Sequence, residues 1–157
     1  MLEARAARPE DRATLEALNV GPEQRRFVSS NQKTFLQWPN EAGAEVFVLW
    51  DGHVAVGLMA CIDLRLATEL SAEDDPNTAF LWRLMIADRY QGKGYGRAAL
   101  GLFESWASNR GLRRLETSVV PDNQSARRLY TAFGFEPTSR VLEGEDVLVR
   151  SASYMGL

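Results

Sequence analysis

Residues 79–97 read AFLWRLMIADRYQGKGYGR, and this stretch decides the fold. Positions 79–86 form a nearly continuous apolar run of strand length, which is typical of a central strand covered on both faces. Positions 91–97 alternate glycine with larger residues and lead into residues at helical spacing, so backbone N–H groups converge at a helix N-terminus. Such a turn is an anion site, and a pyrophosphate is the ligand that we expect it to hold.

This glycine loop fits neither of the two best-known phosphate-binding motifs. A Walker loop requires glycine at position 87 and serine or threonine after Lys93, where this chain has Ala87 and Gly94. A dinucleotide fingerprint would place its third glycine at Arg97 and would open the first strand–helix unit, whereas this loop follows the fourth predicted strand. We interpret it as another kind of phosphate loop, in which the glycines let a phosphate approach the backbone while Lys93 and Arg97 add positive charge.

Upstream of this stretch the sequence predicts strand, helix, helix, strand and strand. The predicted elements are a strand at 2–6, a helix from 9 to about 18, a helical stretch after 22 that ends before 38, and strands at 46–50 and 54–60. Pro9 followed by two acidic residues suits the first turn of a helix, and Pro39 cannot continue one. Asp51-Gly52 between two runs of β-branched and apolar residues predicts a hairpin.

Downstream, the pattern continues to alternate. The predicted elements are a polar surface loop at 68–78 before the central strand, a helix through positions 98–107 that ends at 109–111, a strand at 115–120, a helix between 123 and 134, and strands at 135–141 and 146–150. Asn123 offers a capping side chain, and Gly134 and Gly144 suit a helix end and a turn. The order is β-α-α-β-β-β-α-β-α-β-β, a mixed α/β arrangement that we assign to a single domain over 1–157.

Composition excludes several classes of function. The only cysteine, Cys61, and the only histidine, His53, cannot form an internal disulfide or a metal-ligand cluster, so no metal is expected. A net charge of −3 argues against a nucleic-acid partner, which normally leaves a basic footprint. The sequence has no run of about 18 apolar residues and no secretory signal pattern, so we expect no membrane partner and a cytoplasmic location.

The motif Gln91-x-x-Gly94-x-Gly96 after a strand resembles the coenzyme A pyrophosphate motif of the GNAT family of N-acetyltransferases, whose element order matches the one predicted above. The likeness covers nearly the whole chain. Positions 80–86 and 90–96, together with Phe27-Val28-x-x-Asn31 and Gly134-Phe135-x-x-Thr138, more narrowly resemble the bacterial spermine/spermidine acetyltransferase branch. The resemblance implies a GNAT fold with a mixed, mostly antiparallel sheet flanked by helices, and acetyl-coenzyme A as cosubstrate.

The resemblance also implies roles for single residues. Those matching the cofactor site are Leu84, Met85, Ile86, Gln91, Gly92, Lys93, Gly94, Tyr95, Gly96, Arg97 and Asn123. The backbone at 84–86 would pair with the pantetheine arm, and Tyr130 matches the family's catalytic tyrosine, which protonates the departing thiolate. Asn123 would contact the cofactor, although capping its own helix is an equally good interpretation.

The sequence identifies neither the acceptor substrate nor the general base. An aliphatic ammonium must lose a proton before it attacks, but neither Glu41 nor Glu116 is singled out by the sequence as the base. We expect a small-molecule amine, with a polyamine favoured by the branch resemblance and by the acids at 69, 73, 74 and 75, and Trp82 could line its pocket. The alternatives are a protein N-terminus or lysine, an amino acid, an aminoglycoside, or a non-enzymatic acyl-CoA-binding module, and a homodimer is left open. Ser139, where that branch commonly has glycine, and a long 69–75 loop depart from the polyamine pattern.

Overall fold

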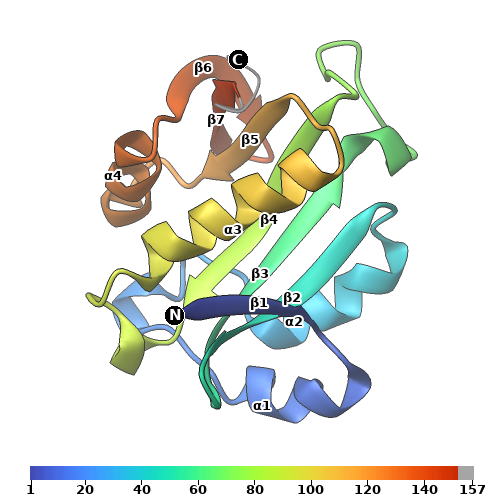
Figure 1. Ribbon diagram of the computed structural model, residues 1–157. Helices are drawn as coiled ribbons and strands as arrows, with labels where there is room; N and C mark the ends of the chain where they lie inside the picture. Colours follow the sequence, from blue (N-terminus) through green and yellow to red (C-terminus); the bar gives the residue numbers. More distant parts are fainter. Residues whose placement is uncertain (152–157) are drawn as a thin grey trace.

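The computed structural model describes residues 1–151 and contains one seven-stranded sheet with the order β1-β2-β3-β4-β5-β7-β6 (Figure 1). The strands are β1 (Leu2–Ala6), β2 (Ala44–Asp51), β3 (Val54–Asp63), β4 (Thr78–Ile86), β5 (Arg114–Val119), β6 (Glu136–Leu142) and β7 (Glu145–Ser151). The helices are α1 (Arg12–Glu16), α2 (Asn31–Gln37), α3 (Tyr95–Asn109) and α4 (Gln124–Ala132). Every neighbouring pair is antiparallel except β4 and β5, which are parallel. The expected mixed, mostly antiparallel α/β fold is confirmed.

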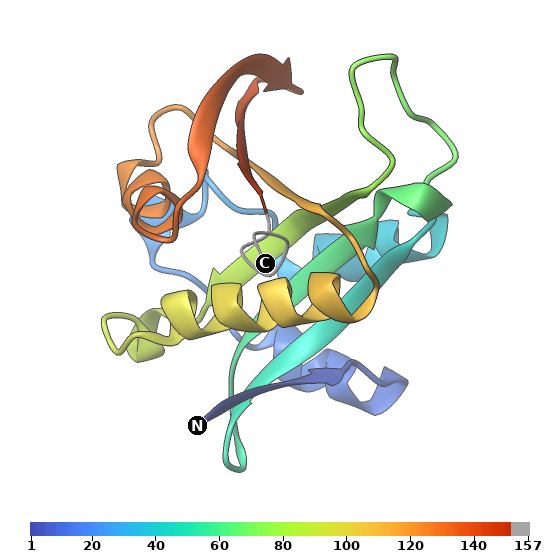
Figure 2. The same ribbon diagram turned by 45° about the horizontal axis from the view of Figure 1, so that its top comes forward.

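The sheet is covered on both faces, as the apolar run in β4 predicts. The helix α3 lies across one face, while α1 and α2 lie across the other (Figures 1 and 2). Successive residues of β3 alternate between the two cores: Met59 belongs to the cluster that contains Phe103 of α3, and Leu58 belongs to the cluster that contains Leu15 of α1. Strands with both faces buried lack the polar alternation of a surface strand, which explains the continuous hydrophobic sequence.

The parallel strands β4 and β5 separate halfway along their length. Their pairing runs from Thr78↔Arg114 to Leu81↔Thr117 and then stops, whereas β4 stays paired with β3 as far as Ile86. The register between β3 and β4 shifts at this point, because Ala60 faces Arg83 while Cys61 faces Leu81, so Trp82 is the extra residue of a β-bulge. A bulge bends its strand and increases the local twist. The bend therefore falls where the gap between β4 and β5 opens.

Two predicted helices are shorter than the sequence indicated. The first is a 3-10 turn at Pro9–Asp11 followed by only five residues of α1, after which the chain turns inward to bury Leu18 and Val20. The second begins only at Asn31, because the Ser30 hydroxyl caps it by accepting a hydrogen bond from the Lys33 backbone N–H at 3.1 Å. The cap leaves 25–30 as a loop beyond a short 3-10 turn, so Phe27 is not helical.

The other predicted elements are confirmed, with ends that differ by a few residues. Pro39 ends α2 as expected, within a 3-10 turn at Trp38–Asn40. The hairpin predicted at Asp51-Gly52 is present: Gly52 and His53 join β2 to β3, and Gly52 has a positive φ of +61°. Within residues 1–151, no helix is long and apolar enough to cross a membrane.

Candidate active site

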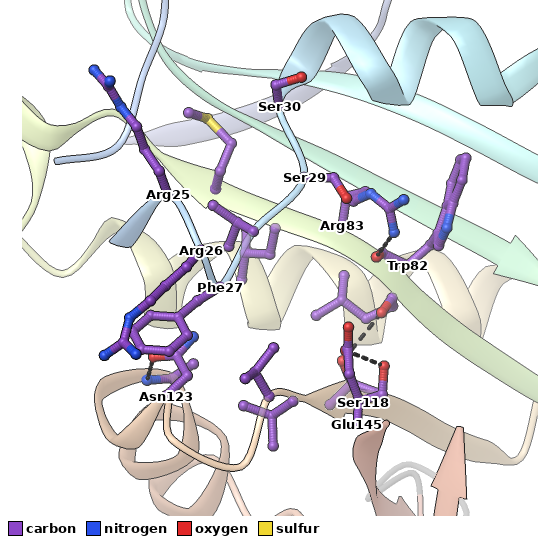
Figure 3. A pocket seen from close by; sticks show the side chains of 18 of the residues that line it. Arg25, Arg26, Phe27, Ser29, Ser30, Trp82, Arg83, Ser118, Asn123 and Glu145 are labelled. Carbon is purple, nitrogen blue, oxygen red and sulfur yellow. Dashed lines mark hydrogen bonds between the residues drawn. The ribbon is translucent and has the colours of Figure 1, made fainter. Parts of the chain in front are cut away.

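Two adjoining cavities open where β4 and β5 separate. The first, which we call the glycine-loop cavity, has a volume of about 330 Å³ and lies at the start of α3. The second, the β4–β5 cavity, has a volume of about 440 Å³ and lies between the two strands (Figure 3). Both cavities are lined by Phe27, Val28, Leu84, Met85, Asn123, Ala126 and Tyr130. The shared walls make them two ends of one cleft.

The glycine loop is held open by its backbone conformation. Gly92 and Gly94 have positive φ angles of +76° and +85°, which favour glycine, and a Cβ at either position would meet no atom within 4 Å. Gly94 is the N-cap of α3, a helix of 15 residues whose first N–H groups have no partner in the helix. The loop therefore offers an open backbone cradle to an anion.

Gly96, the third glycine of the motif, is required for a different reason, which is close packing between two helices. A Cβ at Gly96 would lie 3.1 Å from Cδ2 of Leu129, so glycine here lets α4 pack closely against the start of α3. The sequence interpretation explained all three glycines by the approach of a phosphate. Although Gly96 lines the cavity, its missing side chain also positions the helix that carries Tyr130.

Two side chains of the loop fix its shape instead of facing solvent. The Gln91 amide donates to the Ile86 carbonyl at 2.9 Å and exchanges hydrogen bonds with the amide of Gln24. The Tyr95 hydroxyl donates to the carboxylate of Asp51 in the β2–β3 turn, which lowers the pKa of Asp51 and raises that of Tyr95. These contacts tie the loop to the rest of the sheet.

The remaining predicted cofactor residues divide between the cavity and the surface. Arg97 lines the glycine-loop cavity, whereas Lys93 is exposed to solvent. The backbone at 84–86 lines the same cavity, and the β5-facing edge of β4 beyond Leu81 has no strand partner in the described part of the chain. An unpaired strand edge can bind an extended ligand through its peptide groups.

Tyr130 stands at the junction of the two cavities. Its side chain is 8% exposed, and the ring packs edge-on against Phe135 with centroids 5.8 Å apart. Burial raises the pKa of Tyr130 to about 12, a hydrogen bond with the Thr117 side chain acts in the opposite direction, and the charge of Glu145 raises it further. The phenol therefore keeps its proton at neutral pH and can act as an acid.

Asn123 caps its helix, which is one of the two roles that the sequence left open, and it also lines both cavities. Its side-chain oxygen accepts a hydrogen bond from the Ala126 backbone N–H at 3.2 Å, which caps α4, and the residue lines both cavities. Capping uses the oxygen, so the amide N–H₂ group stays available as a donor.

Several lining residues had no local signal in the sequence. The loop before α2 contributes Arg25 and Arg26, and the strands contribute Ser118 and Glu145, whereas Phe27 and Arg83 belong to the motifs that resemble the polyamine branch (Figure 3). Asn31, part of the motif that resembles the polyamine branch, is buried and donates to the Leu15 carbonyl at 2.7 Å, so it joins α2 to α1.

A third cavity of about 470 Å³ adjoins the β4–β5 cavity, and we call it the acidic cavity. The two share Trp82, Arg83, Ser118 and Glu145. Its acidic lining residues are Glu41, Glu69, Asp74, Glu116, Glu143 and Glu145. Trp82, which the sequence offered as a lining residue of the acceptor pocket, lies on the wall that these two cavities share.

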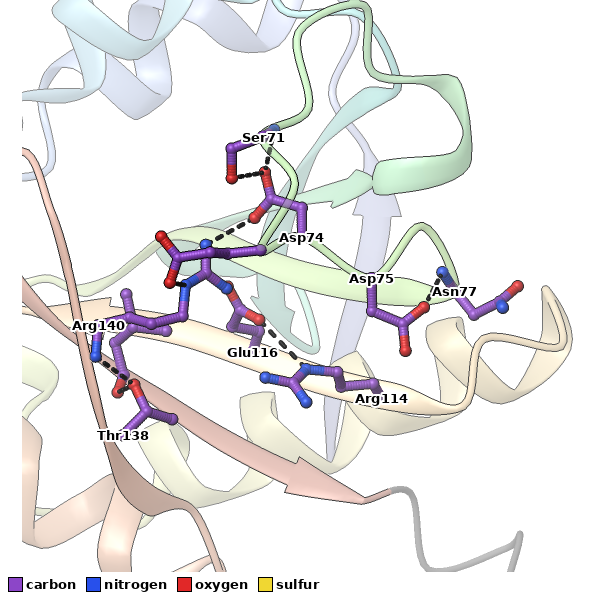
Figure 4. A network of polar contacts seen from close by, with 10 residues as sticks. Ser71, Asp74, Asp75, Asn77, Arg114, Glu116, Thr138 and Arg140 are labelled. Carbon is purple, nitrogen blue, oxygen red and sulfur yellow. Dashed lines mark hydrogen bonds and ion pairs between the residues drawn. The ribbon is translucent and has the colours of Figure 1, made fainter.

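Internal ion pairs change the interpretation of the acidic loop and of Glu116. Arg140 lies 2.7 Å from Asp74 and 3.7 Å from Glu73, so these two acids are partly neutralised within the molecule (Figure 4). Glu116 is 3% exposed and contacts Arg114 at 3.3 Å and Arg140 at 3.6 Å. Burial raises the pKa of Glu116, and the two arginines lower it in part. Glu116 is therefore better explained as a buried structural acid than as the general base.

Residues 1–151 contain no group of three or more His, Cys, Asp or Glu side chains that could hold a metal ion. Cys61 is fully buried in β3, and burial raises the pKa of its thiol well above the ordinary value. A buried neutral thiol is a poor nucleophile.

The model of the acetyltransferase (GNAT) family matches residues 12–135. L-2,4-diaminobutyric acid acetyltransferase of Streptomyces coelicolor is 32% identical over 102 residues, which cover 64% of this chain and 55% of that protein. The chain spans about half the length of several curated relatives that it matches.

Two further similarities extend over almost the entire chain. Spermine/spermidine N(1)-acetyltransferase of Bacillus subtilis is 28% identical over 150 residues, covering 93% of this chain and 95% of that protein. The structure of aminoglycoside acetyltransferase AAC(6')-Ib with coenzyme A and kanamycin superposes with a TM-score of 0.83 at 16% identity, covering 99% and 98% of the two chains. At 16% identity this structural match is evidence of a shared fold alone.

Proposed function

Because the chain belongs to the acetyltransferase (GNAT) family, we propose that it transfers the acetyl group of acetyl-coenzyme A to a primary amine of a small polyamine such as spermidine or spermine. The observation that carries the proposal is the cleft between β4 and β5, which has a phosphate cradle at one end and a protonated phenol at its centre. Direct transfer requires the amine nitrogen and the thioester carbonyl to meet in one cleft in an aligned geometry, with an acid beside the departing sulfur. The two cavities that meet at Tyr130 satisfy this requirement.

The glycine-loop cavity fits the cosubstrate, which supplies the acetyl group as a thioester. Gly92 and Gly94 leave open space at the start of α3 for a pyrophosphate, and Arg97 adds a positive charge beside it. The free edge of β4 at 84–86 offers peptide groups to the amides of a pantetheine arm. Asn123 supplies one more donor at the same wall.

Three chemical tasks remain for the chain at the centre of the cleft. A backbone N–H of β4 near Met85 or Ile86 can polarise the acetyl carbonyl, as oxyanion donors do. Tyr130 can protonate the departing sulfur, because its pKa of about 12 keeps the proton in place until the transfer. The loop at 25–30, which lines the β4–β5 cavity, holds the acceptor against these groups.

The acidic cavity supports a polycationic acceptor. An amine reacting in the β4–β5 cavity can extend past Trp82 and Glu145 into the acidic cavity, because both cavities share these residues. Carboxylates around a cavity raise the local concentration of cations. The relative from Bacillus subtilis that aligns over 93% of this chain is named for spermine and spermidine.

A diamino acid is the second candidate, favoured by one observation on Arg83. Its guanidinium is half-buried between the two cavities and has no carboxylate within 4.0 Å among the described residues, although it donates to Gln37 at 2.7 Å. A half-buried arginine with no carboxylate beside it can bind the carboxylate of a ligand. The relative from Streptomyces coelicolor is named for such an acceptor.

A panel of amines measured by thiol release tests the proposal. We expect kcat/KM to be highest for spermine and spermidine, and KM for spermine to rise with added salt more than KM for a monoamine with a neutral tail. Equal kcat/KM and equal salt response for spermine and the monoamine would refute the polyamine assignment. Preference for 2,4-diaminobutyrate would support the second candidate, and cofactor binding without turnover of any amine would indicate a binding module.

A further inference from the structure

Glu145 is the only carboxylate among the described residues that line the β4–β5 cavity. It is the first residue of β7, immediately after the turn at Glu143 and Gly144, and it also lines the acidic cavity. The Ser118 hydroxyl donates a hydrogen bond to the Glu145 carboxylate at 2.9 Å. The contact fixes the carboxylate at the point where the two cavities meet.

The position of Glu145 relates it to both walls of the cleft. Figure 3 shows Glu145 and Ser118 on the β5 side of the cavity, across from Trp82 and Arg83 of β4. The Glu145 charge raises the pKa of Tyr130 and counteracts the lowering of the Arg83 pKa by burial. The carboxylate is therefore within electrostatic range of the proton donor that the proposed reaction uses.

The other acids near the cleft are less suited to receive a proton from a reacting amine. Glu116 contacts Arg114 and Arg140, as described above, and lines the acidic cavity. Glu41 and Glu143 also line the acidic cavity, whereas Tyr130 lines the β4–β5 cavity. Glu145 alone lines both.

We propose that Glu145 binds the reacting ammonium group of the acceptor in the β4–β5 cavity and takes its first proton. The proposal rests on the proposed acetyltransferase activity. The ammonium loses one proton to Glu145, which holds it during the transfer and afterwards releases it to water. The nitrogen lone pair then forms the C–N bond as the C–S bond breaks, the sulfur takes a proton from Tyr130, and the second proton lost by nitrogen restores the tyrosine. The products are one amide, one thiol and one released proton.

The test compares Glu145→Gln with the wild type between pH 7 and pH 9, using the amine with the highest kcat/KM. Without a proton acceptor, the variant must use the neutral amine, whose fraction rises about tenfold per pH unit below a pKa near 10. We expect kcat/KM of the variant to be about 10²–10⁴-fold below the wild type at pH 7 and the deficit to shrink by about tenfold per unit. Glu136→Gln, which removes an exposed carboxylate on β6, should match the wild type throughout.

Other charged or titratable groups line the two cavities that Glu145 joins, and the comparison must allow for them. They are Arg83 on β4, Glu116 on β5, Tyr130 on α4, Glu143 on the β6–β7 turn, and Glu41, Glu69 and Asp74 around the acidic cavity. Arg25, Arg26 and Lys33 also line the β4–β5 cavity. Tyr130 stays protonated throughout because its pKa is about 12. The two proteins share all of these groups, so the ratio of their rates isolates Glu145.

Binding gives a readout without turnover. Calorimetry at pH 7 should show spermine affinity about tenfold lower in Glu145→Gln and coenzyme A affinity unchanged. A deficit that stays constant with pH, or full activity of the folded variant, would overturn the proposal.

A second variant covers the case in which Glu145→Gln does not fold. Glu145→Asp keeps the carboxylate, so it should keep the pH response of the wild type at a lower rate; a response that tracks the neutral amine would again overturn the proposal. If polyamines are not acetylated but another amine is, the polyamine assignment is wrong. The same pH comparison with that amine then tests the role of Glu145. If no amine is acetylated, both proposals fall.

Discussion

Replacing Tyr130 with phenylalanine removes one hydroxyl from the centre of the cleft. The ring should keep its place, because its edge-on contact with Phe135 and its position in the core do not involve the oxygen. The variant loses only the polar interaction by which the Thr117 side chain lowers the pKa of Tyr130, so the free energy of unfolding should change by no more than about 1 kcal/mol. The change therefore separates chemistry from packing.

The effect on the reaction should be larger than the effect on stability. With a pKa of about 12, Tyr130 is fully protonated between pH 6 and pH 9, so the entire enzyme population carries the acid. Loss of a general acid typically lowers kcat by about 10²–10⁴-fold, which corresponds to about 3–5 kcal/mol in activation free energy. Affinity for coenzyme A should stay within about twofold of the wild type.

The pKa shift also predicts behaviour at high pH. Because the folded-state pKa is raised from 10 to about 12, the neutral phenol favours the folded state below pH 10, and this contribution is lost as the pH rises through 12. The loss amounts to about 3 kcal/mol over this range. Tyr130→Phe should lack this part of the decline, so its stability relative to the wild type should rise between pH 10 and pH 12.

Three measurements check the prediction on one preparation. Thiol release gives kcat, calorimetry gives the affinity for coenzyme A, and urea unfolding at several pH values gives the free energy of unfolding. Full kcat in a folded Tyr130→Phe protein would remove the tyrosine from the mechanism. A parallel fall in kcat and stability would instead assign it a packing role.

Two further predictions concern glycines of the loop and of α3. Gly94→Asp places a negative side chain in the open space of the cradle and should lower coenzyme A affinity by at least tenfold in calorimetry, whereas Gly111→Asp, with a similar φ of +70° and equally open space, should leave that affinity unchanged. Unchanged affinity in folded Gly94→Asp would show that the loop does not hold the pyrophosphate. Gly101→Ala, inside α3 where a Cβ meets no atom within 4 Å, should raise the free energy of unfolding by about 0.5–1 kcal/mol in urea, and a loss would contradict this assignment of free space.

The helix boundaries show how local signals compete. Pro9 and Gly21-Pro22 mark helix starts in the sequence, but a five-residue helix exists mainly because Leu15 is buried against β3. A serine that can cap a helix is a local signal in the sequence, and Ser30 marks the start of α2 in this way. The residues before Ser30 form the loop that lines the cavity. Propensity alone does not decide between these starts, because tertiary packing supplies most of the stability of short helices.

The sequence by itself determined the features that depend on neighbours along the chain. The apolar run of β4 follows from burial on both faces, the positive φ of Gly92 and Gly94 from the turn into α3, and the cap at Asn123 from the start of α4. Each is set within a few residues, so the central strand, the loop and the helix carrying the tyrosine could be predicted.

Only the tertiary structure decided which distant side chains meet. Ser118 and Glu145 are 27 positions apart and Asp74 and Arg140 are 66 apart, so their contacts depend on how β5, β7 and the loop before β4 pack. That packing pairs Arg140 with acids of the 69–75 loop, which the sequence suggested would attract a cationic substrate. It also places Glu145 in the cleft. Burial and charge at a site are sums over all neighbouring segments, and no single segment of sequence contains them.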